Sequence, residues 1–302
     1  MRLLLVYNPN ARLARLVPQE ALVEELRGLG AEVELGLAYD TPEAVAITLD
    51  ALRAGFNRVV AAGGDGTASA VIDALAGTAV PLGIIPLGTG NVLAAEAGLR
   101  PGQWREACRV AVGDELVRID LGKAGDRYFA TMFGVGIDAQ TVVEIAARHK
   151  ANYGRLAFVS QFFKTLLHSK PAHFNVLVDG EPRSFQAWSV IVSNTARYAW
   201  RLHLAPDARP DDGMLNLCCL TSPSRLRLIL EGLSRFVLMS RGASPAIECC
   251  LMRRLTVDAT PPVPWQADGE LGGTTPVEIE VIPQALTVAV RDCNCSLKRR
   301  DR

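Results

Sequence analysis

The chain has 302 residues, its 32 Lys and Arg balance its 32 Asp and Glu, and 49% of its residues are hydrophobic. This length can bury a large core and favours two domains over one. Because the charge is balanced, no overall field attracts nucleic acid, which we do not expect as a partner. The seven cysteines match neither a disulfide framework nor a zinc-binding spacing, so we expect them to be reduced in a cytoplasmic protein.

The first part of the chain alternates short apolar runs with helical patterns. Strands are expected over 2–8, 33–37, 59–62 and 80–85, and helices over 18–27, from 41 onward, and over 68–75, 92–97 and 103–112. In the second helix, Thr41 is the expected N-cap and Pro42 the first helical residue. This alternation predicts an open parallel sheet with right-handed crossovers.

A glycine-rich turn, Gly63-Gly64-Asp65-Gly66-Thr67, separates the third strand from its helix. Glycine lets the backbone approach a ligand closely, and the first N–H groups of a helix have no internal partner, so such a turn can bind phosphate. Asp65 would repel phosphate unless a divalent cation lies between them or its carboxyl group takes part in hydrogen bonding. Taken alone, the motif fits a plain strand-to-helix turn equally well.

The next strand ends in a second glycine-rich turn, Pro86-Leu87-Gly88-Thr89-Gly90-Asn91. Parallel strands end at the same edge of a sheet, so both turns are expected together at a ligand site. Neither turn has the Lys-Ser/Thr of a P-loop, and Ser69 stands where a dinucleotide oxidoreductase needs a small glycine. Residues 74–95 carry no charge, but prolines and glycines interrupt them, which predicts a buried sheet centre and no transmembrane helix.

From residue 116 the pattern changes to hairpins, which predicts a mainly antiparallel, sandwich-like second domain. Strands are expected over 117–123, 128–135, 174–178, 186–193, 214–220, 247–257, 277–282 and 286–290. The expected domains are 1–118 and 119–302, and the last residues can return to the first domain.

Two helices are expected to interrupt the second domain. The first spans 153–167 and is apolar around much of its circumference; the second carries the stripe Leu226, Leu230, Leu233 and Val237. An apolar helical stripe is core by default. The alternative is that the first helix walls an acyl-chain pocket and the second lies on a membrane surface. For the second helix we favour core packing.

The two glycine turns and three later segments resemble the catalytic domain of diacylglycerol kinases and their bacterial lipid kinase relatives. The later segments are Gly134-Val135-Gly136-Ile137-Asp138-Ala139, residues 204–215 with Asp211-Asp212-Gly213, and Gln266-Ala267-Asp268-Gly269-Glu270. All five occur in the family's order and span nearly the whole chain. The resemblance implies ATP, Mg²⁺ and transfer of the γ-phosphoryl group to a lipid hydroxyl, most readily that of diacylglycerol, in a cleft between the domains. It also implies transient contact with a membrane surface as a peripheral protein, with a homodimer as one option.

The resemblance also assigns residues. Those near the nucleotide are Thr41, Gly63, Gly64, Asp65, Gly66, Thr67, Gly88, Thr89 and Asn91. Asp65 orders phosphate, metal or water, and either Asp268 or Glu270 is the general base. A structural Mg²⁺ is assigned to the Asp212 side chain with the carbonyls of Arg209 and Met214.

Three other features of the sequence bear on the site. Asp179-Gly180 lies between two alternating runs and is expected to be a hairpin turn without a catalytic role. Trp200 stands where related chains tend to have glycine, which predicts a narrowed or reshaped acceptor pocket. Two other functions remain open: a soluble NAD kinase-like enzyme, which shares Gly-Gly-Asp-Gly, and a non-catalytic lipid or nucleotide carrier.

Overall fold

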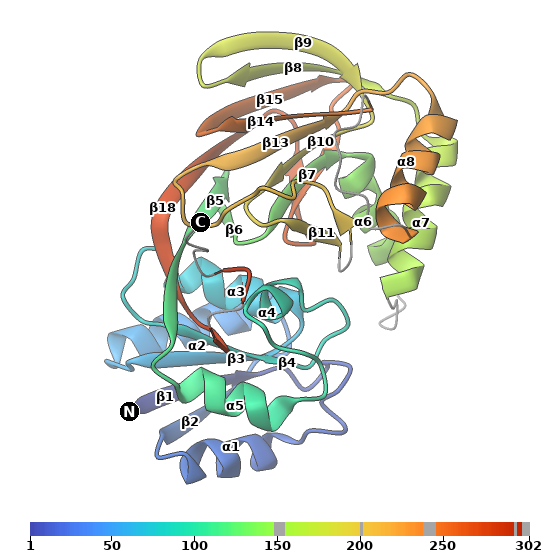
Figure 1. Cartoon of the computed structure of the whole chain (residues 1–302). Coiled ribbons are helices and arrows are strands. Elements are labelled where there is room, and N and C mark those ends of the chain that lie inside the picture. Colours follow the sequence, from blue (N-terminus) through green and yellow to red (C-terminus); the bar gives the residue numbers. More distant parts are fainter. Residues whose placement is uncertain (148–154, 200–201, 238–245, 293–294, 298–302) are drawn as a thin grey trace. The chain divides into compact units, whose positions relative to one another are not determined.

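The computed structural model describes residues 1–147, 155–199, 202–237, 246–292 and 295–297 (Figure 1). The chain divides into two compact units. Unit 1 comprises Met1–Leu121 and Pro283–Arg302, and unit 2 comprises Gly122–Ile282. Trp200 lies outside the described residues. Of the helices in the described ranges, none is long and apolar enough to cross a bilayer.

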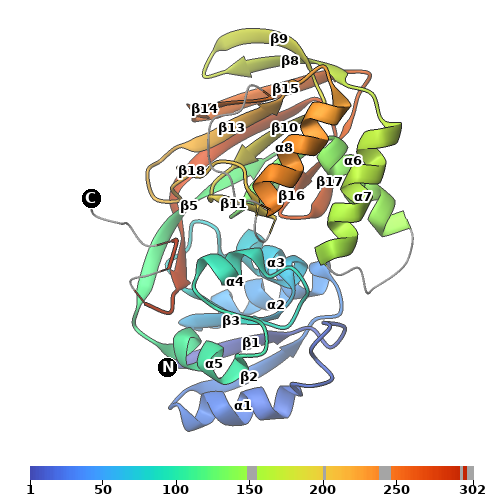
Figure 2. The ribbon, with the colours of Figure 1, turned by 45° about the vertical axis from the view of Figure 1, so that its right-hand side comes forward.

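Unit 1 is built on a parallel sheet with the strand order β2-β1-β3-β4 and the end of β18 beside β4. Its strands are β1 (Arg2–Tyr7), β2 (Glu32–Leu37), β3 (Arg58–Gly63), β4 (Leu82–Pro86) and most of β5 (Leu116–Ala124). Its helices are α1 (Gln19–Gly28), α2 (Thr41–Arg53), α3 (Asp65–Leu75), α4 (Val92–Glu96) and α5 (Trp104–Val112). Helices lie on both faces of this sheet (Figure 2), which explains why β3 and β4 are buried at every residue. The predicted open parallel sheet is confirmed.

Two helix starts in unit 1 differ from the sequence prediction. The N-cap of α2 is Asp40, whose side chain accepts a hydrogen bond from the Glu43 amide at 2.9 Å, so the prediction of Thr41 as cap is wrong. The Glu43 carboxylate accepts in turn from the Tyr39 amide. The two side chains thus pair reciprocally with backbone amides at the helix start, which favours Asp40 as the cap. Helix α3 begins at Asp65 itself, so the second half of the first glycine turn is already helical.

Unit 2 contains, within its described residues, one antiparallel sheet of order β14-β13-β10-β7-β16-β17 and antiparallel pairing in the order β18-β15-β8-β9. Its strands are β6 (Arg127–Phe129), β7 (Met132–Gly136), β8 (Ala172–Val178), β9 (Glu181–Ala187), β10 (Ser189–Ser193), β11 (Arg197–Ala199), β12 (Leu202–His203), β13 (Leu215–Leu220), β14 (Ile247–Met252), β15 (Arg254–Thr260), β16 (Pro264–Ala267), β17 (Glu270–Thr274) and the first half of β18 (Val277–Ala289). The core between them includes Phe129, Phe133, Phe174 and Trp265. The predicted antiparallel β-rich second part is confirmed.

Several element boundaries in unit 2 differ from those expected. The runs 128–135, 186–193 and 247–257 are each broken into two strands, whereas 277–282 and 286–290 form the single strand β18. Three described helices occur here instead of two: α6 (Ile137–Ala147), α7 (Arg155–His168) and α8 (Arg225–Val237). Helix α6 was missed because its sequence, rich in β-branched and small residues, has no clear one-sided apolar pattern.

The expectation that every cysteine is reduced is wrong for one pair. Cys218 of β13 and Cys249 of β14 are directly opposite in the antiparallel register and form a disulfide, with their Cα atoms 4.2 Å apart. Directly opposite residues of antiparallel strands lie within bonding reach of each other's side chains. The sequence did not show this pairing because 31 residues separate the two positions and only strand register brings them together.

Candidate active site

The two glycine turns of unit 1 lie against one another at the carboxyl end of the sheet. The amides of Leu87 and Gly88 donate to the Gly63 carbonyl at 2.8 and 3.1 Å. A Cβ added to Gly88 would stand 2.4 Å from the Cα of Gly64. The turns are therefore in backbone-to-backbone contact, which a side chain at position 88 would prevent.

Asp65 binds the second turn to the first. One carboxylate oxygen accepts from the Asn91 amide at 2.6 Å and the other from the Val92 amide at 2.7 Å. A Cβ on Gly90 would lie 2.1 Å from Asp65 Oδ2, so this glycine makes room for the carboxylate. Asp65, from the start of α3, thus caps the start of α4 and holds the second turn in position.

Two other polar residues of the turns also make internal hydrogen bonds. Thr67 is 7% exposed and its hydroxyl accepts from the Asn8 side chain at 3.2 Å. Asn91 takes a left-handed conformation, with φ of 52°, and its side chain bonds both the amide and the carbonyl of Gly88. These side chains shape the turns, and the backbone amides of the first turn of α3 are the groups best suited to receive a ligand. Among the described residues, no hydrogen bond joins Thr41 to either turn.

Substituting Gly88 tests this contact. We expect Gly88→Ala to push the turns apart, to lower the free energy of unfolding by about 1–3 kcal/mol and to weaken nucleotide binding. Gly28→Ala is the matched control, because a Cβ there meets nothing within 4 Å and the residue ends a helix. Thermal unfolding and calorimetric titration with ATP measure both effects. A Gly88→Ala protein with unchanged affinity and stability would contradict the close contact.

The Asp-Gly-Glu segment of unit 2 is a hairpin turn. Asp268 and Gly269 join β16 to β17 with φ of 48° and 90°, almost the same as the 48° and 91° of Asp179 and Gly180. Both are two-residue turns with positive φ at each position. The predicted hairpin turn at Asp179-Gly180 is confirmed, and turn geometry does not distinguish it from Asp268-Gly269.

The side chain of Asp268 is held by four donors. Its carboxylate accepts from the amides of Ala130, Thr131 and Met132 at 2.7, 3.0 and 2.9 Å, and from the Thr131 hydroxyl. Burial raises the pKa of the Asp268 carboxyl above its ordinary value, while these hydrogen bonds oppose the rise. A carboxylate has about four lone-pair positions, so Asp268 has little capacity left to accept a proton from a substrate. Of the two candidate bases, Glu270 is favoured.

A buried polar network supports the same turn. Asp138, at the start of α6, is fully buried and accepts from the Tyr198 hydroxyl and, at 2.7 Å, from the Gln266 side-chain amide. The side-chain oxygen of Gln266, Oε1, accepts from the Gly269 backbone amide at 2.6 Å. The chain Tyr198–Asp138–Gln266–Gly269 therefore positions the turn that carries Glu270.

No sequence pattern predicted that Tyr198, Asp138 and Gln266 would meet. Asp138 and Gln266 stood within segments that carry the resemblance, but nothing in the sequence paired Tyr198 with Asp138, which is 60 residues away. A Cβ on Gly134 would lie 1.8 Å from Asp138 Oδ2, which explains the first glycine of Gly134-Val135-Gly136. Burial raises the pKa of Asp138 and, well above its usual value, that of Tyr198.

The raised pKa of Asp138 predicts a pH dependence. The folded state binds the Asp138 proton more tightly than the unfolded chain does. Protonation of Asp138 therefore stabilises the fold fully below the ordinary carboxyl pKa of about 3.9, and this stabilisation is lost as the pH rises through the raised pKa of the folded state. Asp138→Asn removes this loss. We expect the melting temperature of the variant, relative to that of the parent, to rise as the pH increases above about 4. Asp268 is present in both proteins, so its contribution cancels. Parallel pH profiles would contradict the assignment.

An apolar cavity of about 50 Å³ adjoins the network. It is lined by Ile137, Phe162, Leu166, Ile191, Tyr198, Leu204, Leu220, Leu228, Glu231 and Ile247. Phe162 and Leu166 belong to α7, the helix for which the sequence left open either core packing or a role as the wall of an acyl-chain pocket. Tyr198 joins the cavity to Asp138. The cavity is much smaller than the roughly 300–1,000 Å³ of typical ligand sites, so only a larger opening could admit a lipid chain.

The residues assigned to a structural Mg²⁺ form a tight turn. Asp212 accepts from the Met214 amide at 3.0 Å, and Arg209 pairs with Asp211 at 3.3 Å. Across the described part of the chain, no three His, Cys, Asp or Glu side chains gather as a metal site.

Unit 1 contains a buried carboxylate that no sequence motif indicated. Asp120 is fully buried and accepts from the Gln284 backbone amide at 2.8 Å.

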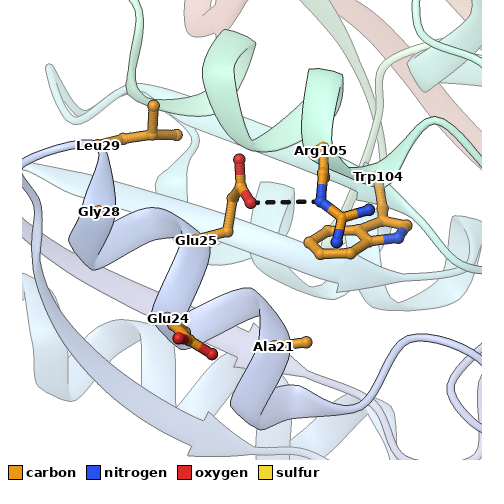
Figure 3. A pocket seen from close by; sticks show the side chains of 7 residues that line it. All are labelled: Ala21, Glu24, Glu25, Gly28, Leu29, Trp104 and Arg105. Carbon is orange, nitrogen blue, oxygen red and sulfur yellow. Dashed lines mark ion pairs between the residues drawn. The ribbon is translucent and has the colours of Figure 1, made fainter.

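A larger groove, of about 440 Å³, lies between α1 and α5 in unit 1 (Figure 3). Glu25 pairs with Arg105 at 3.5 Å, and the Arg105 guanidinium stacks on Trp104 at 4.2 Å. The groove contains no residue of the glycine turns, and an exposed ion pair of this kind contributes about 1 kcal/mol or less. We assign it no role in the active site.

Comparison with known proteins identifies the family. Residues 2–124 match the diacylglycerol kinase catalytic domain, and residues 131–290 match the YegS C-terminal NAD kinase beta sandwich-like domain. A diacylglycerol kinase of Mycobacterium tuberculosis is 31% identical over 274 residues, covering 88% of this chain and 87% of that protein. A diacylglycerol kinase of Staphylococcus haemolyticus is 28% identical, covering 90% and 83%.

The fold of a solved structure agrees with these matches. A crystal structure of a diacylglycerol kinase from Bacillus anthracis superimposes with a TM-score of 0.73 at 16% identity, covering 96% of each chain. At this identity the likeness concerns the fold alone. Together with the matches in sequence, which extend over both units, it shows that this chain belongs to the diacylglycerol kinase catalytic-domain family of lipid kinases.

Proposed function

We propose that this protein is an ATP-dependent lipid kinase that transfers the γ-phosphoryl group to a lipid hydroxyl, with diacylglycerol as the leading acceptor. The observation that carries the proposal is the pair of glycine turns fastened together by Asp65 in a chain of this family. Glycine at the contact and amides at a helix start suit the binding of phosphate groups.

The residues of unit 1 fit a nucleotide better than a tightly held metal. Gly64 and Gly88 approach each other closely and have no side chains that would cover the turn. The backbone amides of Gly64, Gly66 and Thr67, at the start of a helix, are therefore candidate hydrogen-bond donors to phosphate. Mg²⁺ typically keeps several waters and binds substrate phosphates with one or two carboxylates, so a dedicated protein cluster is not required. When bound, Mg²⁺ would neutralise charge on the phosphates. Separately, we propose Asp212 and the carbonyls of Arg209 and Met214 as a structural Mg²⁺ site.

Unit 2 is proposed to act on the acceptor. Glu270 takes the proton from the lipid hydroxyl as that oxygen bonds to the γ-phosphorus and ADP leaves. Gln266 and Asp138 hold the turn that carries Glu270, and the apolar cavity beside Tyr198 opens to receive part of a chain. The protein then works at a membrane surface as a peripheral enzyme.

Incubation with labelled ATP and Mg²⁺, with diacylglycerol, other lipids or NAD as acceptor, tests the proposal. Label in the lipid fraction, strongest with diacylglycerol, is the expected result. The second family domain is described as NAD kinase-like, so label on NAD would favour a soluble kinase instead. Nucleotide or lipid binding without transfer would support a carrier and contradict the kinase proposal.

A further inference from the structure

The leucine stripe of α8 does not pack as the sequence predicted. Leu226 and Leu230 are 64% and 57% exposed, whereas Leu228 and Ile229 contact the core. Core packing is therefore wrong for the first two leucines of the stripe. The side chains of Leu233 and Val237 lie outside the described part of the chain.

Exposed basic residues lie on α8 and at the adjoining end of α7. Arg225 and Arg227 are exposed on α8. The Arg225 guanidinium donates to the Ser169 carbonyl at 2.6 Å, which places the start of α8 beside the end of α7, as Figures 1 and 2 show. Lys164 and Lys170, also exposed, belong to that end of α7 and the residues after it.

Within residues 160–172 and 222–231, the only Asp or Glu is Glu231, which lines the apolar cavity. Two acidic groups approach these segments from neighbouring elements: Glu144 of α6 accepts from the Gln161 and Thr165 side chains of α7, and Glu248 of β14 accepts from Thr221 at 3.5 Å. Leu228 lines the same cavity, with Phe162 and Leu166 of α7. Helix α8 therefore has one side toward an apolar cavity and another that presents leucines and cations to solvent.

We propose that this outer surface, formed by Leu226, Leu230, Arg227, Lys164 and Lys170 and here named the α8 face, docks on an anionic lipid bilayer. The inference rests on the proposed function, because it names the partner from which a lipid kinase takes its acceptor. The leucines insert among the acyl chains while the cations pair with lipid phosphates. A second copy of the chain fits less well, because a symmetric contact would bring the same cations together.

Vesicle co-sedimentation tests the α8 face. The wild-type protein should bind vesicles of equimolar phosphatidylglycerol and phosphatidylcholine, and Leu226→Ser with Leu230→Ser should reduce the partition coefficient by about tenfold or more. Leu251→Ser is the matched control, since Leu251 is 54% exposed on β14. Arg227→Gln with Lys170→Gln should weaken binding to these vesicles but leave the weaker binding to pure phosphatidylcholine unchanged. High salt should mimic the charge variant.

Two further measurements make the outcomes distinct. If the kinase proposal holds, activity of the double leucine variant should fall on diacylglycerol in vesicles and stay unchanged on diacylglycerol in detergent micelles. If no acceptor is phosphorylated but binding still depends on the α8 face, the proposed function fails and this inference stands. Unchanged vesicle binding by the leucine variant would overturn the inference. It would also be overturned if light scattering showed that the wild-type protein is a dimer and the leucine variant a monomer.

Discussion

Asp65→Asn is expected to reduce phosphoryl transfer by about 100-fold or more while the protein stays folded. The wild-type carboxylate accepts one amide on each oxygen, from Asn91 and Val92. An asparagine side chain has only one accepting atom and would present an NH₂ group to the other amide. The second glycine turn would then shift from the first, and the site for phosphate would lose its shape.

Steady-state kinetics and thermal unfolding measure this effect. Loss of a hydrogen bond to a charged group costs about 1.5–3 kcal/mol, so a moderate fall in stability should accompany the loss of activity. Asp50→Asn serves as control, because Asp50 is exposed on α2 and pairs with Arg53 of the same helix. An Asp65→Asn enzyme with normal kcat would show that the tie between the turns is dispensable.

Glu270→Gln and Asp268→Asn are expected to fail in different ways. Glu270→Gln should lower kcat by about 10²–10⁴-fold, the usual contribution of a general base, with little change in stability. Asp268→Asn should lower the free energy of unfolding by about 3 kcal/mol or more. Asparagine replaces one carboxylate oxygen by an NH₂ group, which cannot accept from the amides of Ala130, Thr131 or Met132.

Asp179→Asn is the matched control for the turn. Asp179 has the same backbone conformation as Asp268 and accepts from the amides of Arg253 and Arg254, so its loss should destabilise without affecting kcat in the residual folded protein. Chemical denaturation and kinetics at a temperature where all variants are folded separate the two effects. Normal turnover by Glu270→Gln, with a stable but inactive Asp268→Asn, would reverse the assignment of the base.

Local patterns were sufficient for the fold class. Alternating apolar runs and helices predicted the parallel sheet of unit 1, and hairpin spacing predicted the antiparallel strands of unit 2. Boundaries were less accurate where strands continue across a bend, as in β14 and β15, because the pattern of side chains does not change there. Helix α6 was missed for a related reason, since it lacks a one-sided apolar stripe.

The leucine stripe of α8 shows the limit of periodicity. Its spacing correctly predicted a helix, but two of its leucines face solvent and Leu228 faces the core. Periodicity reports that a face is apolar, and only the packed neighbours determine whether protein covers it. The exposed leucines are therefore a tertiary finding, and they are the basis of the proposed membrane contact.

By itself, the sequence determined the two glycine turns, the order of the family segments and the nature of both sheets, because each depends on residues adjacent in the chain. Only the tertiary structure decided that Asp65 caps α4, that Tyr198 and Gln266 meet Asp138, and that Cys218 bonds to Cys249. It also gave Pro283 as the residue from which the chain belongs to unit 1 again, a return that the sequence had left open. These contacts join residues far apart in sequence. Strand register and burial select them, and no local pattern encodes either.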